Sequence, residues 1–121
     1  MEEVLASHPD VAECAVTGAH DRVKGEIPVG FVVLKSGRDR PGTELKQELV
    51  RLMREKIGPI ASFKEVLIVK RLPKTRSGKI LRGTIKKIAD GIPYQVPATI
   101  EDPEVLSEIR DSLHEQGFPR E

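Results

Sequence analysis

The stretch IPVGFVVL, residues 27–34, is the longest apolar run of the chain. Its β-branched residues predict a strand, and its continuous apolarity predicts that this strand is buried on both faces. Pro28 lacks an amide hydrogen, so this end of the strand is expected at a sheet edge or a bulge. The run is far shorter than the roughly 20 apolar residues of a membrane-spanning helix, and no membrane span is expected.

Two further strands are expected around this run. Residues 11–18 have strand character, and the polar connection 20–26, with Gly25 near its end, is typical of a hairpin turn. A connection this short cannot join parallel strands, so at least one strand pair is antiparallel. Residues 66–69 predict a third strand, and the sheet is expected to have three.

The remaining segments predict helices packed on that sheet, which makes the fold class α+β. Residues 92–103 contain three prolines and are expected to form an extended tail. The expected helices are the end of one at 2–8, one from the candidate N-cap Thr43 to Gly58-Pro59, one from Ile80 to Gly91, and one at 104–115.

Charge is segregated along a chain whose totals nearly cancel. The 20 Lys and Arg residues against 19 Asp and Glu residues exclude a strongly basic nucleic-acid binder on net charge alone. Residues 70–87, however, contain eight basic residues and no acidic one, which leaves the rest of the chain at a net charge of −7. Such a basic segment predicts an anionic partner at one place, with a solvated helix face as the alternative.

Cysteine and histidine usage indicates neither a disulfide nor a metal site. The single cysteine, Cys14, allows no internal disulfide, fits a reducing compartment, and is expected to be buried among its small neighbours. His8, His20 and His114 lack the spacing of metal ligands, and no metal site is expected. No signal peptide is visible at the start of the sequence.

The loop LPKTRSGK, residues 72–79, carries the candidate chemistry. A glycine-containing loop between a strand and a helix can hold a phosphate on free backbone amides, helped by the helix dipole. In that arrangement Ser77 would cap the helix, Gly78 would allow close approach, and Lys79 would project an ammonium group from the first turn. The loop is no Walker A motif, because Pro73 and Ile80 stand where that motif needs Gly and Ser or Thr. It can contribute a cation to a site that other residues complete.

The same loop resembles the C-terminal lysine motif of adenylate-forming enzymes, the superfamily of acyl-CoA synthetases, luciferases and peptide-synthetase adenylation domains. The form PKTRSGKILR, residues 73–82, is especially similar to short-chain acyl-CoA synthetases that act on acetate or propionate. Four further segments resemble the same family in the same order along the chain: HPDVAECAV at 8–16, KGEIPV at 24–29, IGPIA at 57–61 and the tail from Pro93-Tyr94 to Pro103. The tail is more similar to the propionate-type members.

The resemblance implies a mobile C-terminal lid domain at residues 1–91, with residues 92–121 as an extension packed on it. In this family a short-chain carboxylate attacks the α-phosphate of ATP, and the CoA thiolate then displaces AMP after the small domain rotates. ATP, Mg and CoA therefore belong to the full enzyme, and none is expected on this domain alone. The expected partner is the large N-terminal adenylate-binding domain, without which the fragment is expected to be inactive.

The resemblance also implies roles for single residues. Lys79 matches the lysine that bridges the carboxylate and the α-phosphate, and it also matches a target of reversible acylation by a lysine acyltransferase and deacylase. Arg54 falls where acetyl-CoA synthetases have an arginine near the CoA 3′-phosphate, with a solvated helix arginine as the alternative. The residues expected to shape the ATP loop are Lys74, Thr75, Arg76, Ser77 and Gly78.

Two other readings stay open at this point. One is a non-catalytic module that uses residues 70–87 to bind nucleic acid or an acidic protein, and the other is a longer-chain or aryl ligase of the same superfamily. If the chain belongs to a short-chain acyl-CoA synthetase, we expect neither a nucleic-acid nor a membrane partner. We then expect the enzyme in the cytoplasm or the mitochondrial matrix, and the acyl chain length stays open.

Overall fold

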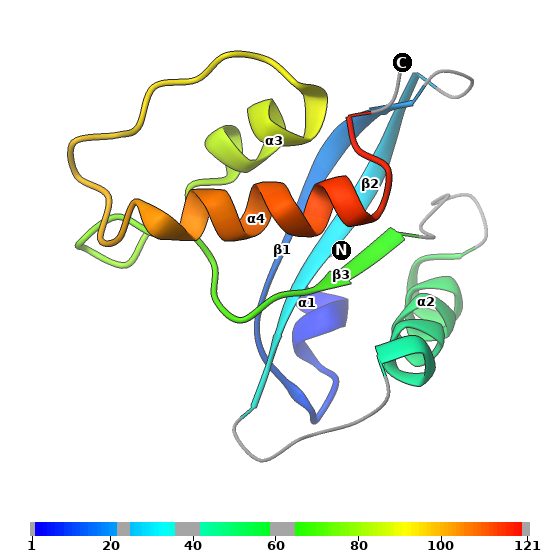
Figure 1. Cartoon of the computed structure of the whole chain (residues 1–121). Helices are drawn as coiled ribbons and strands as arrows, with labels where there is room; N and C mark the ends of the chain where they lie inside the picture. Colours follow the sequence, from blue (N-terminus) through cyan, green and yellow to red (C-terminus); the bar gives the residue numbers. More distant parts are fainter. Residues whose placement is uncertain (1, 22–24, 36–41, 59–64, 120–121) are drawn as a thin grey trace.

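The computed structural model describes residues 2–21, 25–35, 42–58 and 65–119. A three-stranded sheet of order β1-β2-β3 forms the middle of the molecule (Figure 1), which confirms the predicted α+β class. The elements in chain order are α1 (Glu2–Ala6), β1 (Val11–Asp21), β2 (Gly25–Leu34), α2 (Gly42–Ile57), β3 (Glu65–Ile68), α3 (Arg82–Asp90) and α4 (Glu104–Glu115).

The sheet is mixed, and β2 is its central strand. β1 pairs with β2 in antiparallel register, as predicted, while β3 pairs with β2 in parallel. The parallel pair requires a crossover, which α2 supplies between β2 and β3. β3 pairs only with Val29–Val32, so Pro28 has Gly18 of β1 as its one strand partner among the described residues. Pro28 therefore lies at a sheet edge on the β3 side only, although β2 is the central strand. The turn itself falls on residues 22–24, outside the described residues.

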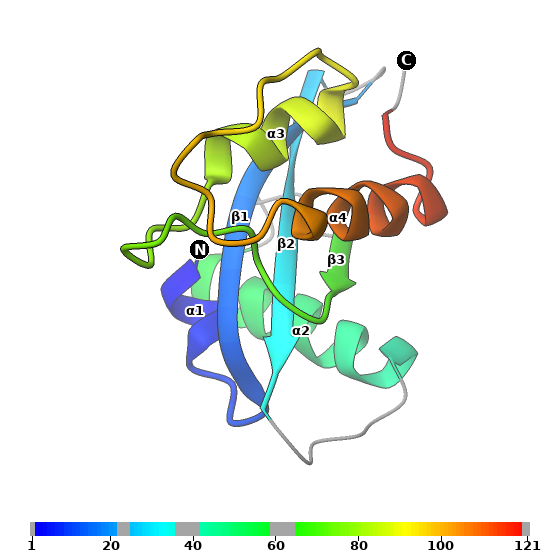
Figure 2. The same cartoon turned by 60° about the vertical axis from the view of Figure 1, so that its left-hand side comes forward.

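Each face of the sheet is covered by two helices (Figure 2). Val29 and Phe31 of β2 point into a core that α3 and α4 complete. Val32, the residue after Phe31, points into a second core with α1 and α2. Val29, Phe31 and Val32 are all fully buried, which confirms that the run 27–34 is covered on both sides.

Two predicted helix boundaries differ from the structure. α2 begins at Gly42, so Thr43 lies inside the helix and is not its N-cap. α1 ends at Ala6 and leaves His8 in a turn. The end of α2 was predicted correctly: Gly58 has φ +106°, and its amide donates to the Arg54 carbonyl over 2.9 Å. Pro59 lies outside the described residues.

The C-terminal segment belongs to the core of the domain. α4 buries Val105, Leu106, Ile109 and Leu113 against the same face of the sheet as α3. Before and after α4, Ile100 and Phe118 also enter this core. Within the described ranges, no helix combines the length and the apolarity that crossing a membrane requires.

Candidate functional site

The predicted loop folds as a small hairpin, residues 74–80, called the lysine hairpin below. Lys74 and Ile80 pair at its base. The Thr75 amide donates to the Lys79 carbonyl over 2.8 Å, and the Gly78 amide donates to the Thr75 carbonyl over 2.9 Å. Gly78 has φ +92°, as the last position of a three-residue turn requires. A side chain at this position would be strained, so the sequence SGK encodes a chain reversal.

This hairpin corrects the prediction that Ser77 caps a helix and that Lys79 lies in its first turn. α3 begins only at Arg82, with Leu81 at the N-cap position and no side-chain capping bond. Pairing keeps the chain extended after Gly78, and the Leu81 amide still donates to the Pro73 carbonyl over 2.9 Å. Lys79 therefore does not lie at a helix N-terminus, and no helix dipole supports anion binding there. The hairpin can contribute only the positive charge of the Lys79 side chain to an anion.

A hydroxyl group stabilises the turn from inside. Thr75 Oγ1 accepts the Lys79 amide over 3.1 Å and shares a hydrogen bond of 2.9 Å with Ser77 Oγ. Thr75 and Ser77, both predicted to shape the loop, thus bond to each other, and Thr75 also bonds to the backbone of Lys79. This arrangement leaves the Lys79 side chain to project from a turn with fixed hydrogen bonds.

The two lysines of the hairpin lie in different surroundings. Lys74 is half-buried and forms an ion pair with Glu13 of β1, which ties the base of the hairpin to the sheet. Arg76, Ser77, Gly78 and Lys79 are exposed. Lys79 has no acidic partner among the residues that the structure describes. A compact charge on a long stem, free of internal pairing, suits a ligand that another part of a protein holds.

The extended tail after α3 pairs with the hairpin, a contact that the sequence did not predict. The Arg76 amide donates to the Thr99 carbonyl over 2.9 Å, and the Glu101 amide donates to the Lys74 carbonyl over 2.8 Å. Thr75 and Ile100 form the antiparallel bridge between them. The only local signal is Thr99-Ile100, two β-branched residues in an otherwise proline-rich stretch.

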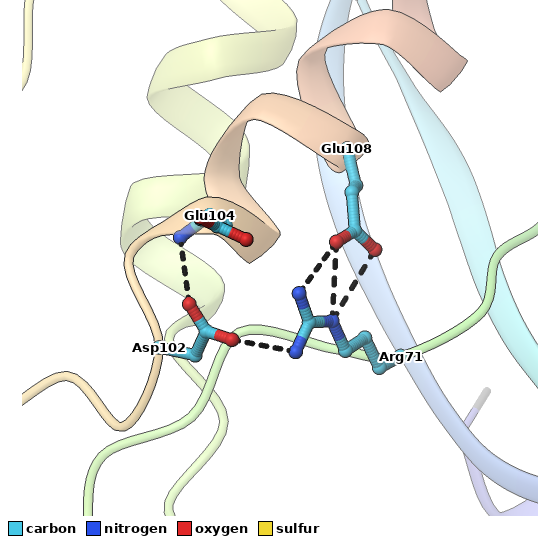
Figure 3. A network of polar contacts seen from close by, with 4 residues as sticks. All are labelled: Arg71, Asp102, Glu104 and Glu108. Atoms are coloured by element: carbon cyan, nitrogen blue, oxygen red, sulfur yellow. Dashed lines mark hydrogen bonds and ion pairs between the residues drawn. The ribbon is translucent and has the colours of Figure 1, made fainter.

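Arg71 fastens this tail beside the base of the hairpin (Figure 3). Its Nη1 donates to Asp102 Oδ2 over 2.7 Å, and its Nη2 donates to Glu108 Oε2 over 2.6 Å. Asp102 Oδ1 also accepts the Glu104 amide over 3.0 Å at the start of α4. That amide and Arg71 lower the pKa of Asp102, and Arg71 lowers the pKa of Glu108. Both carboxylates in turn raise the pKa of Arg71, Glu108 more than Asp102.

Many basic side chains of segment 70–87 are paired with acidic side chains from other parts of the fold. Acidic residues pair with Arg71, Lys74, Arg82 and Lys86. Lys86, for example, donates to Glu26 Oε1 over 2.7 Å and to Asp90 Oδ2 over 3.1 Å. Hydrogen bonding to Glu26, with a smaller effect of Asp90, raises the pKa of Lys86. Half of the eight basic residues are thus neutralised, which weakens the nucleic-acid reading.

Arg54 lies apart from the lysine hairpin in the layered fold. It is an exposed residue near the end of α2, the helix layer on the opposite face of the sheet from α3. With Lys46 and Arg51 it lines an open groove of about 420 Å³ along α2. The structure does not bring Arg54 and Lys79 together, but it leaves both available to a ligand.

Cys14 and His8 have hydrogen-bond partners within the domain. Cys14 is buried, as predicted; its thiol donates to the Glu2 carbonyl over 3.2 Å, and burial raises its pKa. His8 Nδ1 accepts the Asp10 amide over 3.1 Å. Across the described ranges, no three His, Cys, Asp or Glu side chains gather in a way that could hold a metal ion.

Comparison with known sequences extends over nearly the whole chain. A family model described as the AMP-binding enzyme C-terminal domain matches residues 1–79. Acyl-CoA synthetase short-chain family member B, mitochondrial, from Dictyostelium discoideum is 56% identical over 109 residues, 90% of this chain and 16% of that protein. Acetyl-coenzyme A synthetase from Pyrobaculum aerophilum is 46% identical over 115 residues, 95% of this chain and 17% of that protein. The chain thus spans only about a sixth of the length of these curated relatives.

Solved structures show the same fold. An acyl-CoA synthetase from Brucella canis superposes with a TM-score of 0.65 at 37% identity and covers 71% of this chain and 16% of that chain. Acetoacetyl-CoA synthetase from Streptomyces lividans superposes with a TM-score of 0.75 over 96% of this chain and 18% of that chain. Its identity is 22%, so this second likeness concerns the fold alone.

Proposed function

The chain belongs to the AMP-binding enzyme C-terminal domain family, and from this premise we propose that it is the mobile lid of an AMP-forming short-chain acyl-CoA synthetase. The overall reaction would convert a carboxylate, ATP and CoA into acyl-CoA, AMP and pyrophosphate. The observation that carries the proposal is the lysine hairpin, whose exposed Lys79 has no internal acidic partner in the described part of the chain. A large adenylate-binding domain would supply the rest of the site.

In the first half-reaction, a carboxylate oxygen attacks the α-phosphorus of ATP and pyrophosphate leaves. Two anions must approach each other, and negative charge rises on the phosphoryl oxygens. The Lys79 ammonium between the carboxylate and the α-phosphate would offset their repulsion and stabilise that charge. The hydrogen bonds among Thr75, Ser77 and the Lys79 amide support this role, because they fix the stem from which the ammonium reaches out.

ATP, Mg and CoA would bind when this domain closes on the larger one. Residues 74–80 contain no Asp or Glu, and the carboxylate oxygens that Mg prefers would have to come from elsewhere. The hairpin's contribution is positive charge. In the second half-reaction the CoA thiolate attacks the acyl carbon and AMP leaves, after a rotation that takes Lys79 away.

The decisive test separates these two half-reactions in the full-length synthetase. Lys79→Ala should lower acyl-AMP formation by several orders of magnitude and leave thioester formation from supplied acyl-AMP nearly unchanged. Lys87→Ala, at another exposed lysine of the basic segment, is the matched control and should leave both rates unchanged. Equal loss of both half-reactions in Lys79→Ala would contradict the assignment. So would acyl-AMP formation by the isolated 121-residue chain that disappears on Lys79→Ala.

We also assign Arg54 to the 3′-phosphate of CoA. Its exposure on α2, beside Arg51 and Lys46 in an open groove, supports a role in binding a phosphate from solvent. A charge-assisted bond of about 1.5–3 kcal/mol corresponds to roughly a 10- to 100-fold preference for CoA over 3′-dephospho-CoA. Arg54→Ala should abolish that preference, while Lys56→Ala, at an exposed lysine of α2 that does not line the groove, should keep it. An unchanged preference in Arg54→Ala would leave Arg54 as a solvated helix residue.

The cellular setting follows from the same proposal. A buried free cysteine fits the cytoplasm or the mitochondrial matrix, where thiols stay reduced. The Dictyostelium relative is described as mitochondrial. Fractionation of cells that express the full-length protein would distinguish the two compartments.

A further inference from the structure

We propose that the tail segment 99–102 positions Lys79 for adenylation and that Arg71 holds this segment in place. The inference rests on the proposed function of Lys79. The family model matches residues 1–79, so this tail lies outside the matched segment.

The tail and the two arms of the hairpin form one miniature sheet. The Thr75 amide bonds inward to the Lys79 carbonyl. On the other side of the same arm, the Arg76 amide and the Lys74 carbonyl bond outward to Thr99 and Glu101. The arm 74–76 is therefore the middle strand, with the tail on one edge and Lys79 on the other. A shift of the tail would move the strand to which the backbone of Lys79 is bonded.

The tail is anchored more firmly than the hairpin tip. Ile100 is 5% exposed and lies in the core that contains Phe31 and Leu106, whereas residues 76–79 are exposed. One position beyond Glu101, Asp102 accepts hydrogen bonds from Arg71 and from the amide of Glu104, the first residue of α4. The buried contacts that hold the hairpin thus lie at its base and in the tail, because its tip is exposed.

Arg71 connects the two ends of this arrangement. It lies just before the hairpin and reaches both Asp102 of the tail and Glu108 of α4 (Figure 3). One guanidinium therefore keeps the chain entering the hairpin in register with the tail that pairs with it. The planar fork of donors allows this double contact, which a lysine ammonium cannot reproduce with the same geometry.

Adenylation is sensitive to such positioning. Lys79 must lie between two anions in a reactive geometry, and a displacement of about 1 Å can lower a rate roughly 100-fold. The thioester half-reaction does not use Lys79 in the proposed mechanism. A loosened hairpin should therefore slow adenylation alone, whereas an unfolded domain would impair both half-reactions.

The experiment compares two substitutions at one position in the full-length synthetase. Glu101→Pro removes the amide that donates to Lys74, while Glu101→Ala removes only an exposed side chain and keeps that amide. Glu101→Pro should lower kcat for acyl-AMP formation roughly 10- to 100-fold, with little change in the KM for ATP and in the thioester half-reaction. Glu101→Ala should match the wild-type enzyme in all three.

A second pair of variants does not alter the backbone. Arg71→Gln should show the same selective loss of adenylation, and Arg71→Lys should restore it only in part. Arg110→Gln is the control on α4, because the ion pair of Arg110 with Asp111 is exposed and its Nε–Oδ1 distance is 3.8 Å. The proposal is overturned if Glu101→Pro and Arg71→Gln adenylate as their controls do, or if both lose the two half-reactions equally. If Lys79→Ala itself fails to separate the half-reactions, the proposed function fails instead.

Discussion

Glu2 of α1 forms an ion pair with Arg82, the first residue of α3, although 80 positions separate them in the sequence. Arg82 Nε donates to Glu2 Oε2 over 2.8 Å, and the same oxygen accepts the Val16 amide of β1 over 2.9 Å. α1 and α3 belong to cores on opposite faces of the sheet. The pair therefore joins the two helix layers around the edge strand β1, at the start of the helix that follows the lysine hairpin.

This ion pair should make stability depend on pH. The hydrogen bond from Arg82, aided by the Val16 amide and opposed by burial, holds the pKa of Glu2 below its ordinary value of 4.5. A lowered folded-state pKa means that the stabilisation is present above about pH 4.5 and is lost as the pH falls through the lowered pKa. Glu2→Gln should therefore lower the free energy of unfolding at pH 7 by about 0.2–1 kcal/mol, and by less at pH 2.5, where protonation of Glu2 is favoured.

Urea unfolding of the chain at both pH values would measure this difference. Glu3→Gln is the neighbouring control, since Glu3 is exposed and has no ion pair among the described residues. An equal effect of Glu2→Gln at the two pH values would show that the lost interaction is not an ionic one.

Substitution of two glycines near the site by alanine should change the free energy of unfolding in opposite directions. Gly78 has φ +92° and open space where an alanine Cβ would lie, so the cost of Gly78→Ala is backbone strain of about 1–2 kcal/mol. Gly83 also has open space, but it lies in α3 with ordinary helical geometry. Gly83→Ala should raise the free energy of unfolding by about 0.5 kcal/mol, because it restricts the unfolded chain. Denaturant midpoints of the two variants would check both signs.

The central strand and the covering helices could be predicted because their signals are local. Residues 27–34 are apolar without interruption, and a strand buried on both faces needs that pattern. Gly58 and Gly91 were recognised as helix ends, and both have positive φ. The parallel pairing of β3 with β2 could not be predicted, because the four residues of β3 do not indicate whether the strand runs parallel or antiparallel to its neighbour.

The sequence predicted a loop that carries Lys79, but it did not predict the hairpin geometry of that loop. The sequence predicted Lys79 in the first turn of a helix and so placed the helix start too early, since Ile80 and Leu81 fit the apolar face of α3. Pairing of Ile80 with Lys74 inside the hairpin outweighed that helical pattern. On the other side of the same arm, Thr75 pairs with Ile100 of the tail. Such pairing joins segments about 25 positions apart and has no local signature.

Removal of the C-terminal segment should unfold the domain. A chain that ends at Gly91 lacks six core side chains: Ile100, Val105, Leu106, Ile109, Leu113 and Phe118. Each large apolar side chain contributes about 1.5–3 kcal/mol on burial, and their sum is comparable to the total stability of about 5–15 kcal/mol of an ordinary domain. Residues 1–91 should therefore lose cooperative thermal unfolding, while residues 1–119 should keep it. A cooperative transition of residues 1–91 would mean that the extension is an addition to a complete domain.

Acylation of Lys79 should act on chemistry without affecting the fold. The side chain is exposed and has no acidic partner in the described residues, so Lys79→Gln should change the free energy of unfolding by less than about 0.5 kcal/mol. The same substitution removes the cation, and acyl-AMP formation by the full-length synthetase should fall by several orders of magnitude. Enzymatic acetylation should produce the same loss, a deacylase should reverse it, and Lys79→Arg should be insensitive to both treatments. Mass spectrometry of the acetylated protein, combined with adenylation assays before and after deacylation, measures this directly, and full adenylation activity in a fully acetylated Lys79 protein would contradict the role of this lysine.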